Sequence, residues 1–261
     1  MPLSRPSTLH RFLNWQQASS AALLCVLALA LPASAIGAEA EGPSKQEIEA
    51  RHTRLGGIGQ ALGDGKANQA LAAADELIAL YDADNRKPDV DVFCASSPAE
   101  SLLYLLQATA AKRNAVVLDP TWAQALYFRG YALVELKKQT EARVALQRAV
   151  DLSPSNSMYL GELAQLLAQY GEADRALAMF KRAEEAAQTY TPEANRDHDI
   201  ARALRGQGYA LVELRRYDEA ESAYRAVLKM RPGDKLATNE LLYIGMQRTA
   251  AAAAGAASAP H

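Results

Sequence analysis

The sequence predicts an all-α fold built from repeated pairs of antiparallel helices. The first observation is an internal repeat, because the motif GYALVEL occurs at Gly130–Leu136 and again at Gly208–Leu214. The two copies start 78 residues apart, which fits two units of about 34 residues and an insertion of about ten. The second observation is that apolar residues recur with helical spacing inside each unit. Stacked units of this kind bury one continuous apolar core.

The unit at Ala123–Asn156 shows the expected helical hairpin most clearly. Its first helix carries Leu126, Gly130 and Leu133 at i, i+4 and i+7, so these residues share one face. After the polar segment KKQT, a second helix repeats the apolar spacing until Pro154 ends it. A glycine inside a helix costs about 1 kcal/mol relative to alanine. We therefore expect a close approach of the two helix backbones at Gly130.

The residues at fixed positions of this unit resemble those of the tetratricopeptide repeat (TPR) family. Counted from Ala123, positions 4, 8, 11, 20, 24, 27 and 32 hold Leu126, Gly130, Leu133, Ala142, Leu146, Ala149 and Pro154. Counted from Ala201, the same positions hold Leu204, Gly208, Leu211, Ala220, Tyr224, Val227 and Pro232. Counted from Ser157, the first six hold Leu160, Ala164, Leu167, Ala176, Phe180 and Ala183. Position 32 of that middle unit is Gln188, so its second helix is expected to continue until Thr191 and Pro192 start the next one.

The resemblance implies a right-handed superhelix of antiparallel helix pairs, a TPR solenoid, with a C-terminal capping helix. The repeats are expected at 123–156, at 157–200 with the insertion, and at 201–234. The capping helix is expected at 235–248, with one side formed by Leu236, Leu241, Leu242 and Met246. The alanine-rich tail at 249–261 has no side chains able to pack a core and is expected to be disordered.

The region before these repeats has a weaker pattern. Residues 44–85 predict a degenerate N-terminal helical repeat, because glycines interrupt its first helix. Residues 86–97 lack an apolar period and are expected to form a loop. A connecting helix is then expected at 98–120, with Ser97 as its N-cap and an apolar stripe of Leu102, Leu105 and Leu106.

The N-terminus has the order of segments that is typical of a cleaved secretory signal peptide. Arg5 and Arg11 precede the apolar run at 21–31, and small residues follow at 33–35. A membrane anchor is the alternative, but the run is shorter than the roughly 20 residues that span a bilayer. We therefore expect residues 1–35 to be removed and the protein to be periplasmic or secreted.

Charge and motifs argue against several other classes. The formal net charge of −2 gives no electrostatic reason for binding nucleic acid or anionic lipid. The chain contains no metal-binding, phosphate-binding or nucleophile motif of known spacing, so the sequence predicts no cofactor, no metal site and no enzyme activity. After signal cleavage Cys94 is the only cysteine, and it is either a partly buried free thiol, the link of a homodimer, or the nucleophile of a catalytic loop.

The resemblance also implies a concave groove lined by positions 2, 5, 9 and 12 of each first helix. These positions hold Gln124, Tyr127, Tyr131 and Val134, then Met158, Gly161, Gln165 and Ala168, then Arg202, Arg205, Tyr209 and Val212. Tyrosine, methionine and arginine contribute most at interfaces, so such a groove would suit a peptide with acidic and apolar side chains. Alternatively, the tyrosines only pack against neighbouring helices and the arginines are solvated. The family's clamp for chaperone C-termini is absent, because Tyr127, Tyr131 and Glu162 occupy its positions.

Taken together, the sequence predicts a non-enzymatic protein-interaction scaffold of the cell envelope that binds a peptide or helix in this groove. One alternative is an accessory or regulatory subunit of an envelope enzyme or of a secretion or assembly complex. Another is a catalytic protein that uses the segment around Cys94.

Overall fold

The computed structural model describes residues 43–85 and 89–257, with side chains described up to residue 249. The predicted signal peptide at 1–35 and the end of the predicted tail at 258–261 lie outside this part. The described elements, in chain order, are α1 (Lys45–Gly63), α2 (Ala67–Asp84), β1 (Val90–Cys94), α3 (Pro98–Ala110), β2 (Asn114–Leu118), α4 (Thr121–Glu135), α5 (Gln139–Leu152), α6 (Ser157–Gln169), α7 (Ala173–Tyr190), α8 (Glu193–Glu213), α9 (Tyr217–Met230) and α10 (Lys235–Ala257).

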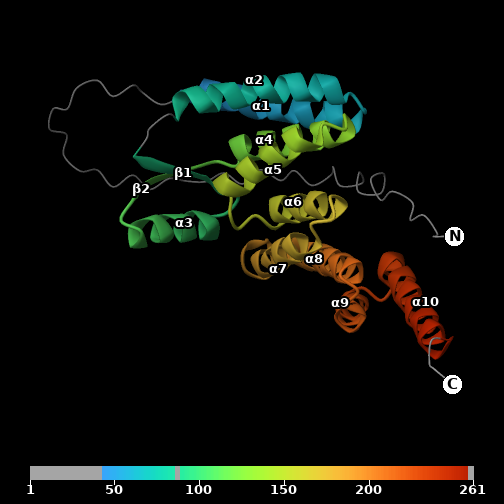
Figure 1. Cartoon of the computed structure of the whole chain (residues 1–261). Coiled ribbons are helices and arrows are strands. Elements are labelled where there is room, and N and C mark those ends of the chain that lie inside the picture. Colours follow the sequence, from blue (N-terminus) through green and yellow to red (C-terminus); the bar gives the residue numbers. More distant parts are fainter. Residues whose placement is uncertain (1–42, 86–88, 258–261) are drawn as a thin grey trace.

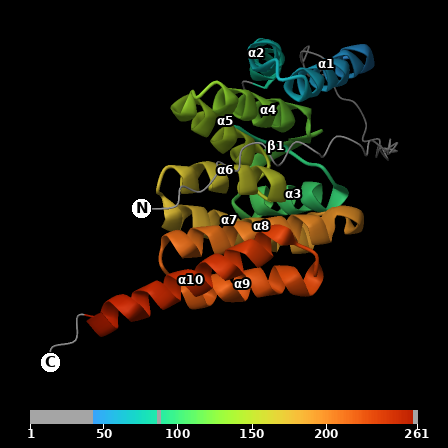
Figure 2. The ribbon, with the colours of Figure 1, turned by 90° about the vertical axis from the view of Figure 1, so that its right-hand side faces the viewer.

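The helices form antiparallel pairs that stack in chain order into a solenoid. Both ribbon views show α1 with α2 at one end, followed by the pairs α4 with α5, α6 with α7 and α8 with α9 (Figures 1 and 2). α10 lies against α9 at the other end. The predicted all-α solenoid fold is thus confirmed, with a small sheet added to it.

The same backbone turn joins the two helices of every pair. Gly65, Lys137, Gly171 and Arg215 each have a positive φ, between 58° and 74°. The amide of the residue that follows each one donates back to a carbonyl of the preceding helix, as Lys138 does to Leu133 at 2.8 Å. Because the turn at Gly65 has this geometry too, α1 and α2 form a complete helix pair despite the glycines of α1.

The two helices of a pair touch where a glycine meets a large side chain. A Cβ atom added to Gly130 would lie 2.7 Å from Cγ of Leu146, and one added to Gly208 would lie 2.6 Å from the ring of Tyr224. The closest neighbour of Gly130 is therefore a side chain of the partner helix, with the carbonyl of Ala142 further away at 3.5 Å. The expected close approach exists, and it occurs between the backbone of one helix and a side chain of the other.

The insertion in the middle repeat lengthens two helices. α7 continues past Gln188 to Tyr190, and α8 begins at Glu193, two turns before the repeat that starts at Ala201. Thr191 is the last cap of α7, and Pro192 precedes the first residue of α8. The extra residues therefore extend the helical pair and do not form a separate loop.

The structure corrects the predictions for residues 86–97 and 98–120. A strand, β1, lies inside the expected loop, and the end of the expected helix is a second strand, β2. The strands pair in parallel, from Val90 opposite Asn114 to Cys94 opposite Leu118, and α3 connects them. Their sequences, VDVFC and NAVVL, are rich in β-branched and aromatic residues that favour strands. Lys112, with φ of 56°, ends the helix before β2.

The packing side of α3 also differs from the expected one. Leu102, Leu105 and Leu106 are exposed by 59%, 43% and 58%, whereas Tyr104 is fully buried. The ring of Tyr104 stacks on Phe93 of β1 at 5.1 Å between centroids, and its hydroxyl accepts a hydrogen bond from the amide of Ser155 at 3.1 Å. The helix therefore packs on the sheet through its aromatic residue, and its leucines face solvent.

Cys94 is a free thiol that lies completely inside the protein. It ends β1, and its carbonyl accepts a hydrogen bond from Oγ of Ser153 at 2.6 Å. Burial raises the pKa of the thiol to about 12. The predicted disulfide-linked homodimer and the catalytic loop both need an accessible thiol, so the structure corrects both of these interpretations.

The capping helix packs through residues that were not expected to do so. Ala237 and Ile244 are buried, with Leu241 between them, while Leu242 and Met246 are exposed. The helix also continues to Ala257, into the segment that was expected to be disordered. No helix within the described residues is long and apolar enough to cross a membrane.

Two glycine substitutions should have opposite effects on stability. Gly130→Ala should lower the free energy of unfolding by about 1–2 kcal/mol, because the new methyl group would collide with Leu146. Gly56→Ala is the matched control, since an added Cβ there meets nothing within 4 Å. It should raise the free energy of unfolding by about 0.5–1 kcal/mol through helix propensity alone. Urea unfolding followed by circular dichroism measures both, and equal effects would contradict the proposed contact.

The thiol of Cys94 should react only after unfolding. In a Cys25→Ser background, an aromatic disulfide reagent should leave the native protein unlabelled at pH 8 and should label Cys94 once urea is added. Even at pH 9 the folded protein should react slowly, because a thiol whose pKa is raised to about 12 remains protonated there. Rapid labelling of the native protein would restore Cys94 as a linking or catalytic residue.

Candidate functional site

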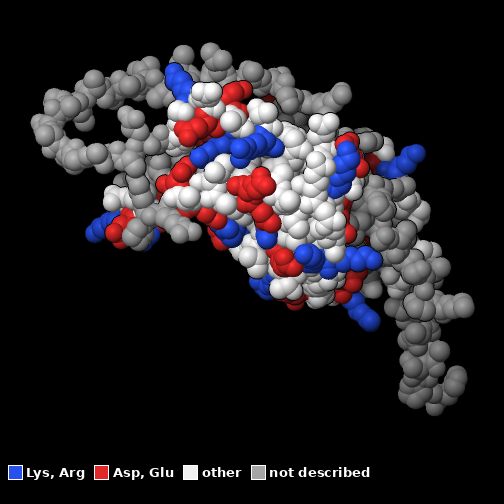
Figure 3. All heavy atoms as spheres, turned by 90° about the horizontal axis from the view of Figure 1, so that it is seen from above, with Lys and Arg blue, Asp and Glu red and all other residues white. Residues whose placement is uncertain are grey.

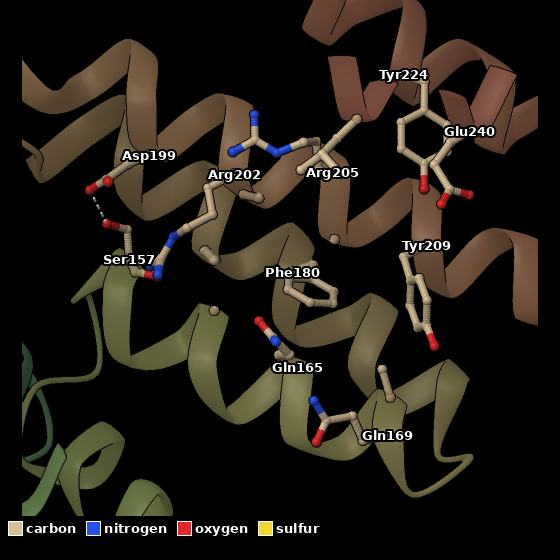
Figure 4. Close-up of a pocket in the computed structure, with 16 residues that line it drawn as sticks. Ser157, Gln165, Gln169, Phe180, Asp199, Arg202, Arg205, Tyr209, Tyr224 and Glu240 are labelled. Carbon is tan, nitrogen blue, oxygen red and sulfur yellow. Dashed lines mark hydrogen bonds between the residues drawn. The ribbon is translucent and has the colours of Figure 1, made fainter. Parts of the chain in front are cut away.

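A pocket of about 120 Å³ opens between α6, α7 and α8, next to the beginning of α10. Figure 4 shows side chains from all of these helices around it, together with Tyr224 of α9. Its lining consists of Ser157, Gly161, Gln165, Ala168, Gln169, Phe180, Ala183, Asp199, Arg202, Ala203, Arg205, Gly206, Tyr209, Tyr224, Leu236 and Glu240. It is the site at which two consecutive repeats and the capping helix meet.

The pocket contains half of the predicted groove residues. Gln165, Arg202, Arg205 and Tyr209 line it, and so do Gly161 and Ala168 from the same set of positions. The other four, Gln124, Tyr127, Tyr131 and Met158, are half-buried and lie outside it. The groove positions of the second and third TPR units therefore converge, while those of the first do not join them.

Tyr127 contributes mainly to packing between repeats. Its ring stacks on that of Tyr159 in α6, with centroids 5.4 Å apart and the planes at 29°. Burial raises the pKa of the Tyr127 hydroxyl well above its usual range, with a further contribution from the nearby charge of Glu162. For this residue the packing alternative describes the structure better than an open groove contact.

Both arginines of the pocket are held in ion pairs across helices. Arg202 donates to Glu162 at 3.0 Å and to the carbonyl oxygen of Ser157 at 3.3 Å. Arg205 donates to Asp234, which precedes α10, at 2.6 Å. All four charged side chains are at least three-quarters buried, with exposures between 9% and 21%. The expectation of two positive charges free to meet an acidic peptide is therefore wrong.

Asp199 joins the start of α6 to the insertion. Its Oδ2 accepts hydrogen bonds from the hydroxyls of Ser157 at 2.7 Å and Thr191 at 3.2 Å, and the first of these is drawn in Figure 4. Burial by itself raises the pKa of Asp199, but contacts with His198 and Ser157 and the charge of Arg202 outweigh it and lower the pKa. A carboxylate that looked like part of a solvated helix start is thus a buried, ionised group.

Several pocket residues were missed because they occupy core positions of the repeat. Phe180 and Tyr224 stand at position 24, where the first unit has Leu146. A Cβ added to Gly206 would lie 2.2 Å from the ring of Phe180, so this glycine lets the ring fit against α8. The alternation of Gly206 and Gly208 was the sequence signal that could have located both aromatic contacts.

The surface charge does not single out another binding site on the face viewed from the α1 end of the solenoid. Basic and acidic side chains alternate there without a large area of one sign (Figure 3). Within residues 43–85 and 89–257, no group of three or more His, Cys, Asp or Glu is placed to hold a metal ion. The pocket is thus the best-defined candidate site of the described chain.

Comparisons with solved structures agree with this architecture. The chain is similar to MamA (41-end) from Desulfovibrio magneticus RS-1, with a TM-score of 0.51 and 15% sequence identity over 76% of this chain and 85% of that chain. A MamA RS-1 ArsTM double mutant matches with a TM-score of 0.50 and 14% identity over 76% and 84% of the two chains. The first TPR of Spaghetti (RPAP3) bound to the HSP90 peptide SRMEEVD is 23% identical, covering 51% of this chain and 97% of that chain, with a TM-score of 0.44.

Sequence comparisons identify the repeats directly. A search of curated proteins gives no significant match. In contrast, family models described as tetratricopeptide repeat match residues 123–156, 140–194, 162–235 and 205–259. These matches together cover more than half of the chain and coincide with the helix pairs from α4 to α10. The chain therefore belongs to the tetratricopeptide repeat family.

Proposed function

We propose that this protein is a non-enzymatic interaction scaffold that binds a segment of a partner protein along its concave side. The observation that carries the proposal is the pocket itself, which is formed by the groove positions of two consecutive repeats. Gln165, Arg202, Arg205 and Tyr209 come from first helices of different repeats, α6 and α8, and meet around one opening. A bound segment that follows the groove would pass over this opening.

The size of the pocket indicates what enters it. Sites for small molecules and cofactors usually measure about 300–1,000 Å³. The volume of about 120 Å³ is well below that range, and it is suited to one side chain of a larger ligand. A single side chain buried among aromatic residues at the centre of an interface is the usual form of a binding hot spot. The pocket thus favours a polypeptide over a metabolite as the ligand.

We further propose that this scaffold acts in the cell envelope. This part of the proposal rests on the sequence of residues 1–35, with arginines, an apolar run and small residues in the order of a secretory signal. A repeat protein without catalytic groups would serve there by holding another envelope protein in place.

Substitution of one pocket tyrosine tests the binding proposal. Peptides selected from a randomised display library on the full chain should bind in solution, as measured by fluorescence anisotropy. Tyr209→Ala should weaken this binding by about 30-fold or more, because it removes an aromatic wall of the pocket. Tyr170→Ala is the matched control, since Tyr170 is exposed and does not line the pocket. Equal affinity of both variants, with unchanged circular dichroism, would place the binding elsewhere.

Expression of the full chain in a bacterium tests the location. We expect the purified protein to start at Ile36, because Ala33-Ser34-Ala35 is a small-residue cleavage site. Intact mass and N-terminal sequencing of protein from the periplasmic fraction give the answer. A substitution of two arginines for Leu27 and Leu29 in the apolar run should keep the chain in the cytoplasm. Recovery of uncleaved chain from the cytoplasm without that change would contradict the proposal.

A further inference from the structure

We propose that the pocket selects a lysine or arginine side chain of the bound segment. This inference rests on the proposed function, since it names the partner chemistry of the same pocket. It is opposite in sign to the acidic peptide that the two arginines of the groove had suggested.

The first argument is the balance of charge around the opening. The charged side chains of the lining are Asp199, Arg202, Arg205 and Glu240. The two arginines are in turn held by Glu162 and Asp234. Two positive charges thus meet four negative ones, and the site has a formal charge of −2.

The balance remains negative when the less certain charges are considered one at a time. Burial raises the pKa of Glu162, but the guanidinium of Arg202 at 3.0 Å favours its ionised form. Without Glu162 the formal charge would still be −1. Arg231 acts on Arg205 through space, but it is exposed, so solvent and salt screen its charge.

The second argument is that the positive charges are already used. Arg205 is 15% exposed and its partner Asp234 only 9%, and their nitrogen and oxygen atoms lie 2.6 Å apart. To bind an acidic side chain, Arg205 would have to leave a buried carboxylate without its partner, which is strongly unfavourable. Arg202 is constrained in the same way by Glu162 and the carbonyl oxygen of Ser157. An acidic ligand would therefore compete with internal ion pairs.

The third argument is the aromatic wall. Phe180, Tyr209 and Tyr224 line the pocket, and Figure 4 shows the carboxylate of Glu240 beside the ring of Tyr224. A cation over an aromatic face is attracted by the ring, and the methylene stem of lysine or arginine packs well on apolar surface. A volume of about 120 Å³ is suited to one such side chain. Aromatic rings next to a carboxylate thus match both parts of a basic side chain.

The experiment exchanges the anchoring residue of the peptide and leaves the protein unchanged. Peptides selected on the full chain are scanned with alanine to find the residue whose affinity depends on Tyr209. We expect that residue to be lysine or arginine, and its replacement by norleucine, which keeps the stem and removes the charge, should weaken binding about tenfold. Replacement by glutamate should weaken it further. An anchor that is acidic, or one whose norleucine form binds as tightly, would overturn the inference while leaving a peptide-binding scaffold in place.

A protein variant gives the second readout. Glu240→Gln should weaken the lysine or arginine peptide about five- to tenfold and should leave the norleucine peptide unchanged. Glu141→Gln on the exposed side of α5 is the matched control and should affect neither. Equal losses for the charged and uncharged peptides would overturn the inference. Failure to select any peptide whose binding depends on Tyr209 would overturn the proposed function and the inference together.

Discussion

The close contact of a glycine with a large side chain is the constraint on which the helix pairs depend. Gly130 receives Leu146, and Gly208 receives Tyr224, so a different large residue fits the same position in two repeats. Because the backbone of one helix accepts the side chain of the other, the two helices pack as a rigid unit. In the middle repeat the equivalent large residue is Phe180, and its ring also reaches Gly206 in the following helix. The contact that closes one pair thus shapes the wall of the pocket beside it.

The insertion determines how this wall is held. The longer α7 and the early start of α8 bring Thr191 and Asp199 next to Ser157, where their hydrogen bonds fix the beginning of α6 against α8. A buried carboxylate with several donors is stable only while all of them remain in place. The relative position of α6 and α8, which form the two sides of the pocket, therefore depends on residues that a regular repeat would not contain.

The sequence predicted the helix pairs well because their signals are local. Apolar spacing, Pro154 and the two glycines each act within about one repeat, and the structure has its helices accordingly. The strands β1 and β2 were missed since each is only five residues long and pairs with a segment more than twenty residues away. The face of α3 was misjudged for a related reason: leucine periodicity shows that a helix has an apolar side, but the partner decides which side is buried. Tyr104 found its partner in Phe93, and the leucines did not find one among the described residues.

The same distinction between local and distant information applies to the chemistry of the pocket. Repeat positions indicated correctly that Arg202, Arg205 and Tyr209 lie on the inner side of the solenoid, but a position says nothing about the partner of a charge. Arg202 is paired with a residue 40 positions earlier and Arg205 with one 29 positions later, in the neighbouring repeat and before the capping helix. Pairing across repeats consumes the positive charge and leaves carboxylates in excess. In a solenoid the sign of a groove is therefore a property of adjoining repeats, because each repeat supplies side chains whose charges its neighbours can cancel.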